Sequence, residues 1–204
     1  MGLVDYMEAA RLLNKYGINT IESKYVKSAA EAVKFAGNEQ IVMKVLSEKA
    51  LHKTKAGVVK LGLSGEKQIT DAFNELYRKA AELKPYSIIV QKMAKPGNEI
   101  IIGGREDPQF GKIIMIGIGG IYVEAFKDVA IRICPIKRYD ANEMLNQLKS
   151  KQIVTQNGKA TEMVVNLLLK VDKLLTENSI SELDLNPVIV RESDYSVVDI
   201  RMLK

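Results

Sequence analysis

The sequence predicts an α+β fold made of two lobes, in which strands and helices alternate irregularly. Short apolar runs such as 41–46 and 112–118 are typical of buried strands, whereas 68–83 has the apolar spacing of an amphipathic helix. The order of these elements lacks a regular βαβ repeat, which favours α+β lobes over a doubly wound parallel sheet. A chain of 204 residues is long for one ordinary domain and sufficient for two compact lobes.

The first lobe is expected over residues 21–86, after an N-terminal helical segment at 1–20. Within that segment, residues 3–16 have the pattern of an amphipathic helix that ends at Gly17. Ser28 and Glu31 have the spacing of a capping box, which predicts the start of a second helix that ends near Gly37. The other elements expected in this lobe are strands at 41–46 and 58–63 and a helix at 68–83.

The second lobe is expected over residues 87–204. It contains four predicted strands, two predicted helices and a C-terminal β-hairpin. These elements are expected at 87–93, 99–103, 112–118 and 129–134, at 140–150 and 160–177, and at 183–190 with 197–201.

Composition excludes several classes of protein. The single cysteine, Cys134, rules out an intramolecular disulfide or a thiolate cluster and favours a reducing cytoplasm. The N-terminus has no secretory pattern, and no apolar run is long enough to span a membrane. The net charge of +5 comes from lysines spread among acidic residues, without a basic run or interleaved aromatic residues. We therefore expect a cytoplasmic protein that binds neither nucleic acid nor a membrane.

Polar residues of the C-terminal hairpin are candidate ligands of a divalent metal. Strand alternation places Asp184 and Asn186 on one face of the first strand. A register that pairs the strand ends brings Asn186 close to Asp199. Oxygen ligands from neighbouring strands suit Mg²⁺ beside nucleotide phosphates. Considered alone, the hairpin favours a surface turn with solvated polar residues, and the other segments of the chain favour the metal site.

Lys44 and the loop after it form a candidate phosphate site. Lys44 lies in the middle of an apolar strand, so it either lies on an exposed face or pairs with an anion, because burying an unpaired ammonium is costly. The loop 47–57 contributes lysines, among them Lys53, and backbone amides near Gly57, all of which suit phosphate. His52, the only histidine, lies in this loop; it is either a solvated residue or a nucleophile toward phosphorus.

The strand 87–93 and Glu99 form a candidate site for a purine and a ribose. Backbone groups of Gln91, Lys92 and Met93 can recognise a purine edge, and Glu99 can accept hydrogen bonds from ribose hydroxyls. An ordinary turn followed by a surface glutamate explains the same residues. A glycine-rich stretch at 111–120 lacks the Rossmann spacing and predicts a backbone that bends tightly or passes close to a ligand.

Taken in order, these segments resemble the ATP-grasp subunit of the NDP-forming acyl-CoA synthetases, specifically the short β subunits of the ADP-forming acetate–CoA ligase family. The matching segments span nearly the whole chain in the order of that family. They are 45–47 with 51–54, 90–94 with 96–97, 107–111, 119–124 and 183–187.

The resemblance implies an ATP-grasp fold, in which two α+β lobes clasp ATP. It assigns Lys44 to the phosphates, Gln91–Met93 to the adenine, Glu99 to the ribose, and Asn186 with Asp199 to Mg²⁺. Two departures from the family concern Ala56-Gly57, where paired glycines are usual, and 155–159, which lacks the usual aromatic and arginine residues.

The resemblance also implies a reversible reaction, in which acyl-CoA, ADP and phosphate give the free acid, ATP and CoA. The phosphoryl group travels on histidine, first on a CoA-binding α subunit in an α2β2 complex and then on His52. The further ligase domain found in the related succinyl-CoA synthetases is expected on another polypeptide.

Two other functions remain open from the sequence. One is an ATP-grasp ligase that works through an acyl-phosphate, which has no need of His52. The other is a nucleotide-sensing module without turnover, against which the retention of Lys44, Glu99, Asn186 and Asp199 argues. The identity of the acyl acid and the choice between ADP and GDP are not determined by these residues.

Overall fold

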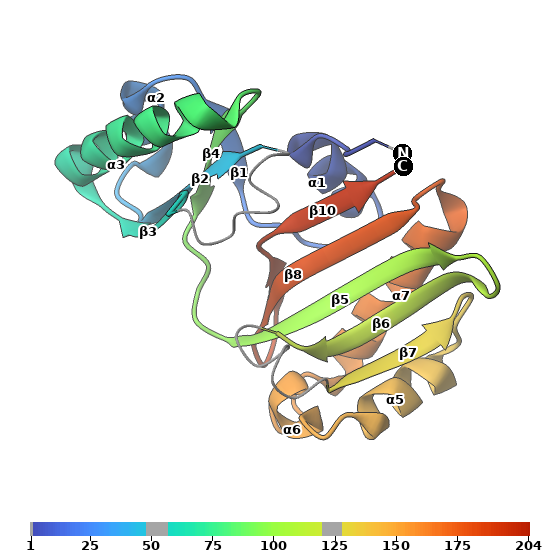
Figure 1. Ribbon diagram of the computed structural model, residues 1–204. Helices are drawn as coiled ribbons and strands as arrows, with labels where there is room; N and C mark the ends of the chain where they lie inside the picture. Colours follow the sequence, from blue (N-terminus) through green and yellow to red (C-terminus); the bar gives the residue numbers. More distant parts are fainter. Residues whose placement is uncertain (1, 48–56, 120–127) are drawn as a thin grey trace. The chain divides into compact units, whose positions relative to one another are not determined.

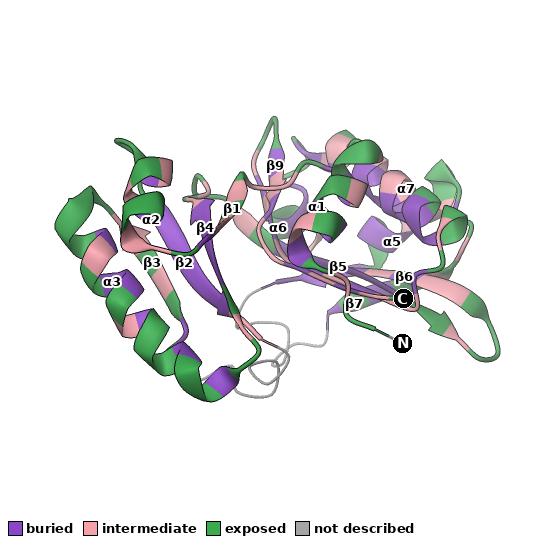
Figure 2. Cartoon of the chain, turned by 90° about the horizontal axis from the view of Figure 1, so that it is seen from above, coloured by how far each residue is buried: buried purple, intermediate pink, exposed green. Residues whose placement is uncertain are grey.

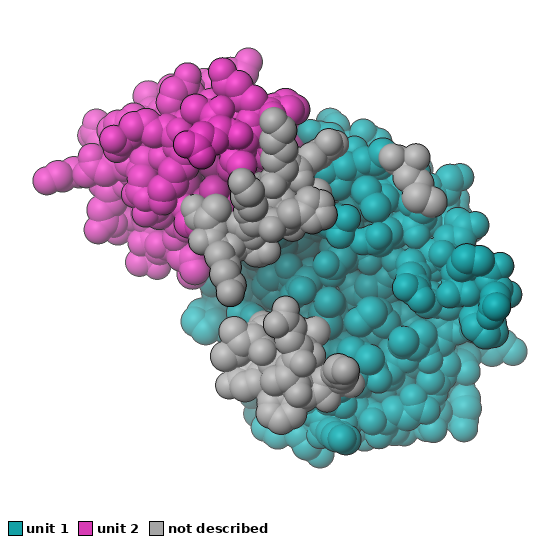
Figure 3. Space-filling view, in the orientation of Figure 1, with its two compact units in different colours: residues 1–20, 94–204 teal, residues 21–93 magenta. Residues whose placement is uncertain are grey.

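The chain consists of two compact α+β units, shown separately in Figure 3. The computed structural model describes residues 2–47, 57–119 and 128–204. Unit 1 comprises Met1–Thr20 and Ala94–Lys204, and unit 2 comprises Ile21–Met93. Within the described residues, no helix is long and apolar enough to cross a lipid bilayer.

The boundaries of the units differ from the expected ones. Strand β4 (Ser87–Lys92) pairs with β1 (Ser23–Val26) and β2 (Ile41–Leu46), so its hydrogen bonds keep residues 87–93 in unit 2. The segment 1–20 is not separate but belongs to unit 1, because the backbone N–H of Val4 donates to the carbonyl of Met202 at 2.9 Å. Backbone pairing, which apolar periodicity does not report, therefore sets both boundaries.

Unit 2 is one four-stranded antiparallel sheet in the order β1–β4–β2–β3, with two helices packed on one face (Figure 1). Its remaining elements are α2 (Ala29–Ala36), β3 (Val59–Leu63), α3 (Gly65–Ala80) and a 3₁₀ turn (Ala81–Leu83). The predicted start of α2 is confirmed, because Ser28 Oγ accepts a hydrogen bond from the N–H of Glu31 at 3.2 Å. The Glu31 carboxylate accepts from the N–H of Lys27 instead of Ser28, so the box is not reciprocal.

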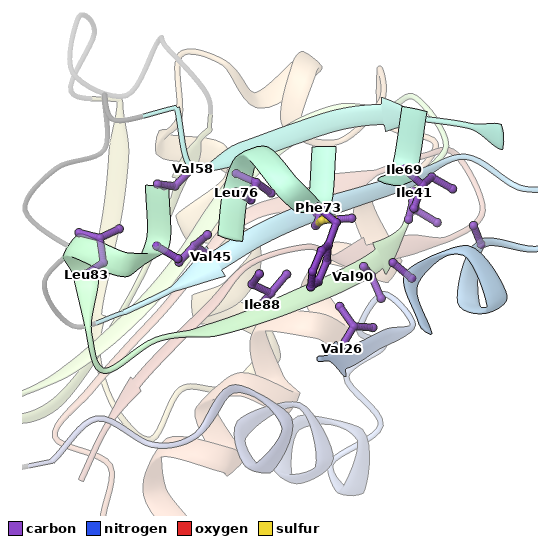
Figure 4. Packing of buried hydrophobic residues seen from close by; sticks show 14 residues of the cluster. Val26, Ile41, Val45, Val58, Ile69, Phe73, Leu76, Leu83, Ile88 and Val90 are labelled. Atoms are coloured by element: carbon purple, nitrogen blue, oxygen red, sulfur yellow. The ribbon is translucent and has the colours of Figure 1, made fainter. Parts of the chain in front are cut away.

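The core of unit 2 lies between its sheet and α3. Figure 4 shows Phe73 of α3 pointing onto side chains of the sheet. The buried residues that the strands contribute alternate along each strand: Ile41, Met43 and Val45 from β2, and Ile88 and Val90 from β4. Because side chains alternate across a sheet, the residues between them, which include Lys44 and Gln91, lie on the face away from the helices.

Unit 1 is a six-stranded antiparallel sheet in the order β10–β8–β5–β6–β7, with β9 paired to β8. Its strands are β5 (Asn98–Asp107), β6 (Gly111–Ile118), β7 (Val129–Ile133), β8 (Glu182–Val190), β9 (Tyr195–Val197) and β10 (Ile200–Leu203). Its helices are α1 (Tyr6–Lys15), α5 (Arg138–Gln147), α6 (Lys151–Val154) and α7 (Thr161–Glu177). The mixed content of both units confirms the predicted α+β class.

The two faces of this sheet differ in character. Figure 2 shows α5 and α7 on the same side of the strands, where Ile114, Leu183 and Leu185 are buried. A Cβ on Gly104 would lie 2.3 Å from Leu175 of α7, which shows how closely that helix packs. No helix described in unit 1 covers the opposite face, which we call the open face.

Gly97, just before β5, lies close to the backbone of β8, so a larger residue at this position should destabilise the fold. A Cβ at Gly97 would lie 2.5 Å from the carbonyl oxygen of Val190, a backbone atom that cannot rotate away. We expect Gly97→Ala to lower the free energy of unfolding by about 1–3 kcal/mol, as overpacking does. Gly2→Ala is the control, because a Cβ there meets nothing within 4 Å. Equal urea midpoints for the two variants would contradict the prediction.

Candidate functional site

The C-terminal strands bring Asn186 and Asp199 opposite each other, as the sequence predicts. Val188 pairs with Val197 in the β8–β9 ladder, and Leu185 pairs with Ile200 in the β8–β10 ladder. Both ladders share one register, so Asn186 stands across from Asp199 where the two ladders meet. Paired positions in antiparallel strands lie roughly 4.5–5.5 Å apart, which suits two oxygen ligands of one cation.

Asp184 lies on the same face of β8, two residues before Asn186. Its burial, followed by the nearby negative charge of Asp199, raises its pKa above the ordinary value, while Arg201 acts in the opposite direction. Its Oδ1 is buried and accepts no hydrogen bond from any residue that the structure describes. A buried acceptor next to a second carboxylate is stabilised by a cation, so these residues fit Mg²⁺.

The donor set has the composition that Mg²⁺ prefers. Two carboxylates and one amide oxygen leave the remaining positions to water and phosphate oxygens. In the described part of the chain, no group of three His, Cys, Asp or Glu side chains comes together. The arrangement therefore matches an ion shared with a nucleotide better than a metal held wholly by protein.

Arg201 is a member of this site that the sequence analysis missed. It pairs with Asp184 across β8 and β10, and its Nη1 lies 3.1 Å from Glu182 Oε1. Alternation along β10 places it on the same face as Asp199, two residues earlier. The spacing Asp199-x-Arg201 in the sequence could have indicated that Arg201 belongs to this site. Its guanidinium places a fixed positive charge beside the carboxylates.

Lys44 is buried in the middle of β2 with 8% of its surface exposed, so the exposed alternative is excluded. It pairs with Ile89, and Gln91 pairs with Val42 two residues along the same two strands. Lys44 and Gln91 therefore share the sheet face away from α2 and α3. Gln91, itself 1% exposed, donates from Nε2 to Ser23 Oγ at 3.0 Å. Two buried polar side chains therefore lie on the face that does not pack against the helices.

The strand end at 91–93 provides fewer free backbone donors than expected. The N–H groups of Lys92 and Met93 donate to the carbonyls of Glu22 and Gln40 at 3.0 and 2.9 Å. These residues would therefore have to recognise a purine edge through their carbonyl groups. The Lys92 ammonium donates to the Phe35 and Ala36 carbonyls at the end of α2, so this side chain stabilises the helix.

Glu99 is exposed at the start of β5, opposite Ile189 of β8. Gly97 lies in the turn that precedes Glu99. The N–H of Gly119 donates to the Glu99 carbonyl at 2.8 Å. A Cβ at Gly119 would lie 3.0 Å from backbone atoms of Glu99 and Ile100. The space next to Gly119 on that side is therefore filled by the backbone of β5.

The motif Asp107–Gly111 is also structural. The Asp107 carboxylate accepts hydrogen bonds from the N–H groups of Gln109 and Phe110 at 2.9 and 3.2 Å, and Gly111 has φ +71°. This is a three-residue hairpin loop that joins β5 to β6. Asp128 accepts from the N–H groups of Lys149 and Ser150, so it orders a loop as well. Glu124 and Lys127 lie outside the described residues.

His52 and Lys53 also lie outside the described residues, but both ends of their segment are anchored to the α3 region. Ser47 Oγ donates to the Leu83 carbonyl at 2.5 Å, and Lys79 Nζ donates to the Gly57 carbonyl at 3.3 Å. Glu75 pairs with Lys79 and with Lys60 at 2.9 and 2.7 Å. Hydrogen bonds from those two lysines lower the pKa of Glu75 to about 2, so the ion-pair network persists at neutral pH.

Comparison with known proteins identifies the family. The family model described as an ATP-grasp domain matches residues 2–203. The chain belongs to the ATP-grasp domain family. It is 38% identical to the β subunit of ADP-forming acetate–CoA ligase II of Pyrococcus furiosus, across 96% of this chain and 88% of that protein. It is equally identical to acetate–CoA ligase I of Archaeoglobus fulgidus, of which it spans only 31%.

Solved structures give the same family. Dinucleotide-forming acetyl-coenzyme A synthetase 1 of Ca. Korarchaeum cryptofilum, in complex with coenzyme A and Ca-AMPCP, matches with a TM-score of 0.88 at 34% identity. The match covers 98% of this chain and 93% of that one. A second structure of that enzyme contains Mg-AMPPCP, with a phosphohistidine segment pointing towards the nucleotide-binding site. The ATP-grasp fold expected from the sequence is thereby confirmed.

Proposed function

We propose that this ATP-grasp chain is the nucleotide-binding β subunit of an ADP-forming acyl-CoA synthetase. Together with a CoA-binding α subunit, it converts acyl-CoA, ADP and phosphate reversibly to the free acid, ATP and CoA. The observation that carries the proposal is the register that sets Asn186 opposite Asp199, beside the partly buried Asp184, on one sheet face. Similarity to β subunits over nearly their full length supports it.

In this proposal, Asn186, Asp199 and Asp184 would hold Mg²⁺, which would supply positive charge to the phosphates of the nucleotide. Lys44 and Lys53 contribute positive charge to the phosphates, together with the backbone near Gly57. Glu99 accepts hydrogen bonds from the ribose hydroxyls. Gln91, Lys92 and Met93 face the adenine, with carbonyl acceptors in place of the N–H groups that are already donated.

His52 carries the phosphoryl group in this scheme. In the direction of ATP formation, the bond between phosphorus and the imidazole nitrogen of phosphohistidine breaks, and a bond to a terminal oxygen of ADP forms. The imidazole nitrogen regains a proton from water. The α subunit supplies the phosphoryl group from acyl-CoA and phosphate, and we place the assembled α2β2 complex in the cytoplasm.

Reconstitution tests this function. The chain and its CoA-binding partner are purified separately and mixed with Mg²⁺, ADP, phosphate and a panel of acyl-CoA thioesters. We expect ATP formation from the pair and none from either chain alone. The panel is needed because the relatives include ligases named for acetate, 4-hydroxybutyrate and trans-ferulate. Release of an acyl-phosphate without ATP would favour a different ATP-grasp ligase.

Lys44 gives a test of the nucleotide site that does not need the partner. Lys44→Met keeps the apolar stem and removes the charge, so the variant tests the charge while most of the packing is kept. The increase in melting temperature caused by Mg·ADP should largely disappear, because ligand stabilisation follows affinity. Lys34→Met on α2 is the control. A Lys44→Met protein that melts much earlier yet binds Mg·ADP normally would make Lys44 structural.

A further inference from the structure

The open face of unit 1 has an apolar half on β7 and β6. Val129, Ile131 and Ile133 alternate along β7 and are 39%, 49% and 54% exposed. Their partners on β6 include Met115 and Ile113, which are only partly buried. These five side chains form what we call the β7 patch. A contiguous exposed apolar set of this kind is typical of an interaction site in a stable protein.

The β7 patch is accessible through its face, whereas the strand edge is protected. The N–H of Cys134 donates to the Lys112 carbonyl, so in this ladder the backbone groups of Ile131 point outward. Arg132 Nη1 donates to the outward carbonyl of Ile131 at 2.8 Å and to Gln147 Oε1 at 3.0 Å. An arginine that covers the edge opposes pairing with another strand. A partner would therefore contact the side chains.

The same face continues from the β7 patch to the candidate metal ligands. One row of paired residues crosses the sheet: Ile131, Met115, Gly103, Asp184 and Arg201. Gly103 carries no side chain between the apolar and the charged parts of this row. A protein that covers the β7 patch is thereby held beside the carboxylates.

The comparisons indicate which protein must cover it. The chain spans 88% and 89% of two proteins named as β subunits, and about 30% of longer ligases. A β subunit acts together with another subunit, so under the proposed function this chain has a second polypeptide as its partner. Under the proposed function, that polypeptide hands over a phosphoryl group to the nucleotide held beside Asp184 and Asp199.

We propose that the β7 patch is the docking surface for the CoA-binding partner chain. This inference rests on the proposed function, because it takes the partner from it. Apolar side chains provide the association energy, and the shared face places the partner next to the nucleotide. The protected edge of β7 disfavours pairing of this strand with a β-strand of a second copy of the chain.

The test compares variants of the β7 patch with a control on unit 2. Ile131→Lys and Ile133→Lys place a charge in the patch, whereas Leu61→Lys places one at a 66% exposed apolar position on β3. We expect each patch variant to weaken binding to the purified CoA-binding chain at least tenfold by calorimetric titration. The control should bind like the wild type. All three isolated chains should retain the wild-type circular dichroism spectrum and affinity for Mg·ADP.

Several outcomes would overturn the inference. Unchanged affinity of both patch variants for the partner would exclude the patch from the interface. Loss of Mg·ADP binding by a folded, isolated variant would assign the patch to the nucleotide site. A wild-type dimer that Ile131→Lys dissociates, with partner affinity unchanged, would make a second copy the occupant. If the wild-type pair assembles but forms no ATP, the proposed function fails while the docking surface stands.

Discussion

His52→Ala is expected to abolish ATP formation by the reconstituted pair while leaving the affinity for Mg·ADP unchanged. A phosphoryl group passed between distant sites through water is exposed to hydrolysis, so the relay needs a covalent carrier. Imidazole is one of the few side chains that accept phosphorus and release it again. His52 is the only histidine of the chain, so no other residue of this type can replace it.

Two half-reactions separate this role from a general loss of activity. The partner's own histidine should still be phosphorylated from acyl-CoA and phosphate in the presence of His52→Ala. Transfer of that group to ADP should be absent. Glu48→Ala, four residues earlier in the same segment, is the control and should retain turnover within a few-fold. Full turnover by His52→Ala would reduce this histidine to a solvated residue.

The C-terminal hairpin shows how far sequence reasoning reached. Alternation of Leu183 and Leu185 with Asp184 and Asn186 determined which side chains share a face, and the structure confirms it through burial of the two leucines. The polar turn at 191–194 limited the register, so Asp199 could be placed opposite Asn186. Periodicity and turn length depend only on a short segment of the chain, so both can be read from a single sequence.

The errors arose where long-range pairing decides the outcome. The end of unit 2 lies at Met93 because β4 joins β1 and β2, and apolar patterning does not reveal which strands pair. For the same reason, the sequence left a tight bend and the approach of a ligand as alternatives for the glycines at 117 and 119, and did not show that strands pack closely there. In the structure, a Cβ at Gly117 would lie 2.7 Å from the Asp128 carbonyl, so a neighbouring strand occupies that space.

At 91–93, the sequence also did not show which backbone groups are available to a ligand. Backbone donors at a strand end are free only when no other segment reaches them. Here the Glu22 and Gln40 carbonyls accept from Lys92 and Met93. The sequence carries no mark of these contacts, because any residue type offers the same carbonyl. The side chains of a site can thus be predicted more readily than its backbone groups.

Asp199→Asn and Asp199→Ala are expected to weaken Mg²⁺-dependent binding of ADP at least tenfold, about 1.4 kcal/mol. Both variants remove a negative charge that faces the cation. Asparagine retains an oxygen that can accept from the N–H of Ile200, as Asp199 Oδ1 does at 3.2 Å. If both variants lose affinity alike, the missing charge is the cause. If only Asp199→Ala does, the lost hydrogen bond is the cause.

Substitution of Asp199 should weaken nucleotide binding without destabilising the fold, because the charge of Asp199 disfavours the ionised form of Asp184. The negative charge of Asp199 contributes to the raised pKa of Asp184, second to burial. Removing it relieves repulsion between two carboxylates, so the melting temperature without Mg²⁺ should stay equal or rise. Asp194→Ala is the matched control, since Asp194 lies in the turn of the same hairpin and pairs with Arg191. Calorimetric titration checks this prediction. If Asp199→Asn and Asp199→Ala bind Mg·ADP like the wild type and like Asp194→Ala, Asp199 is not a metal ligand. The assignment of Asn186, which rests on its register with Asp199, then fails as well.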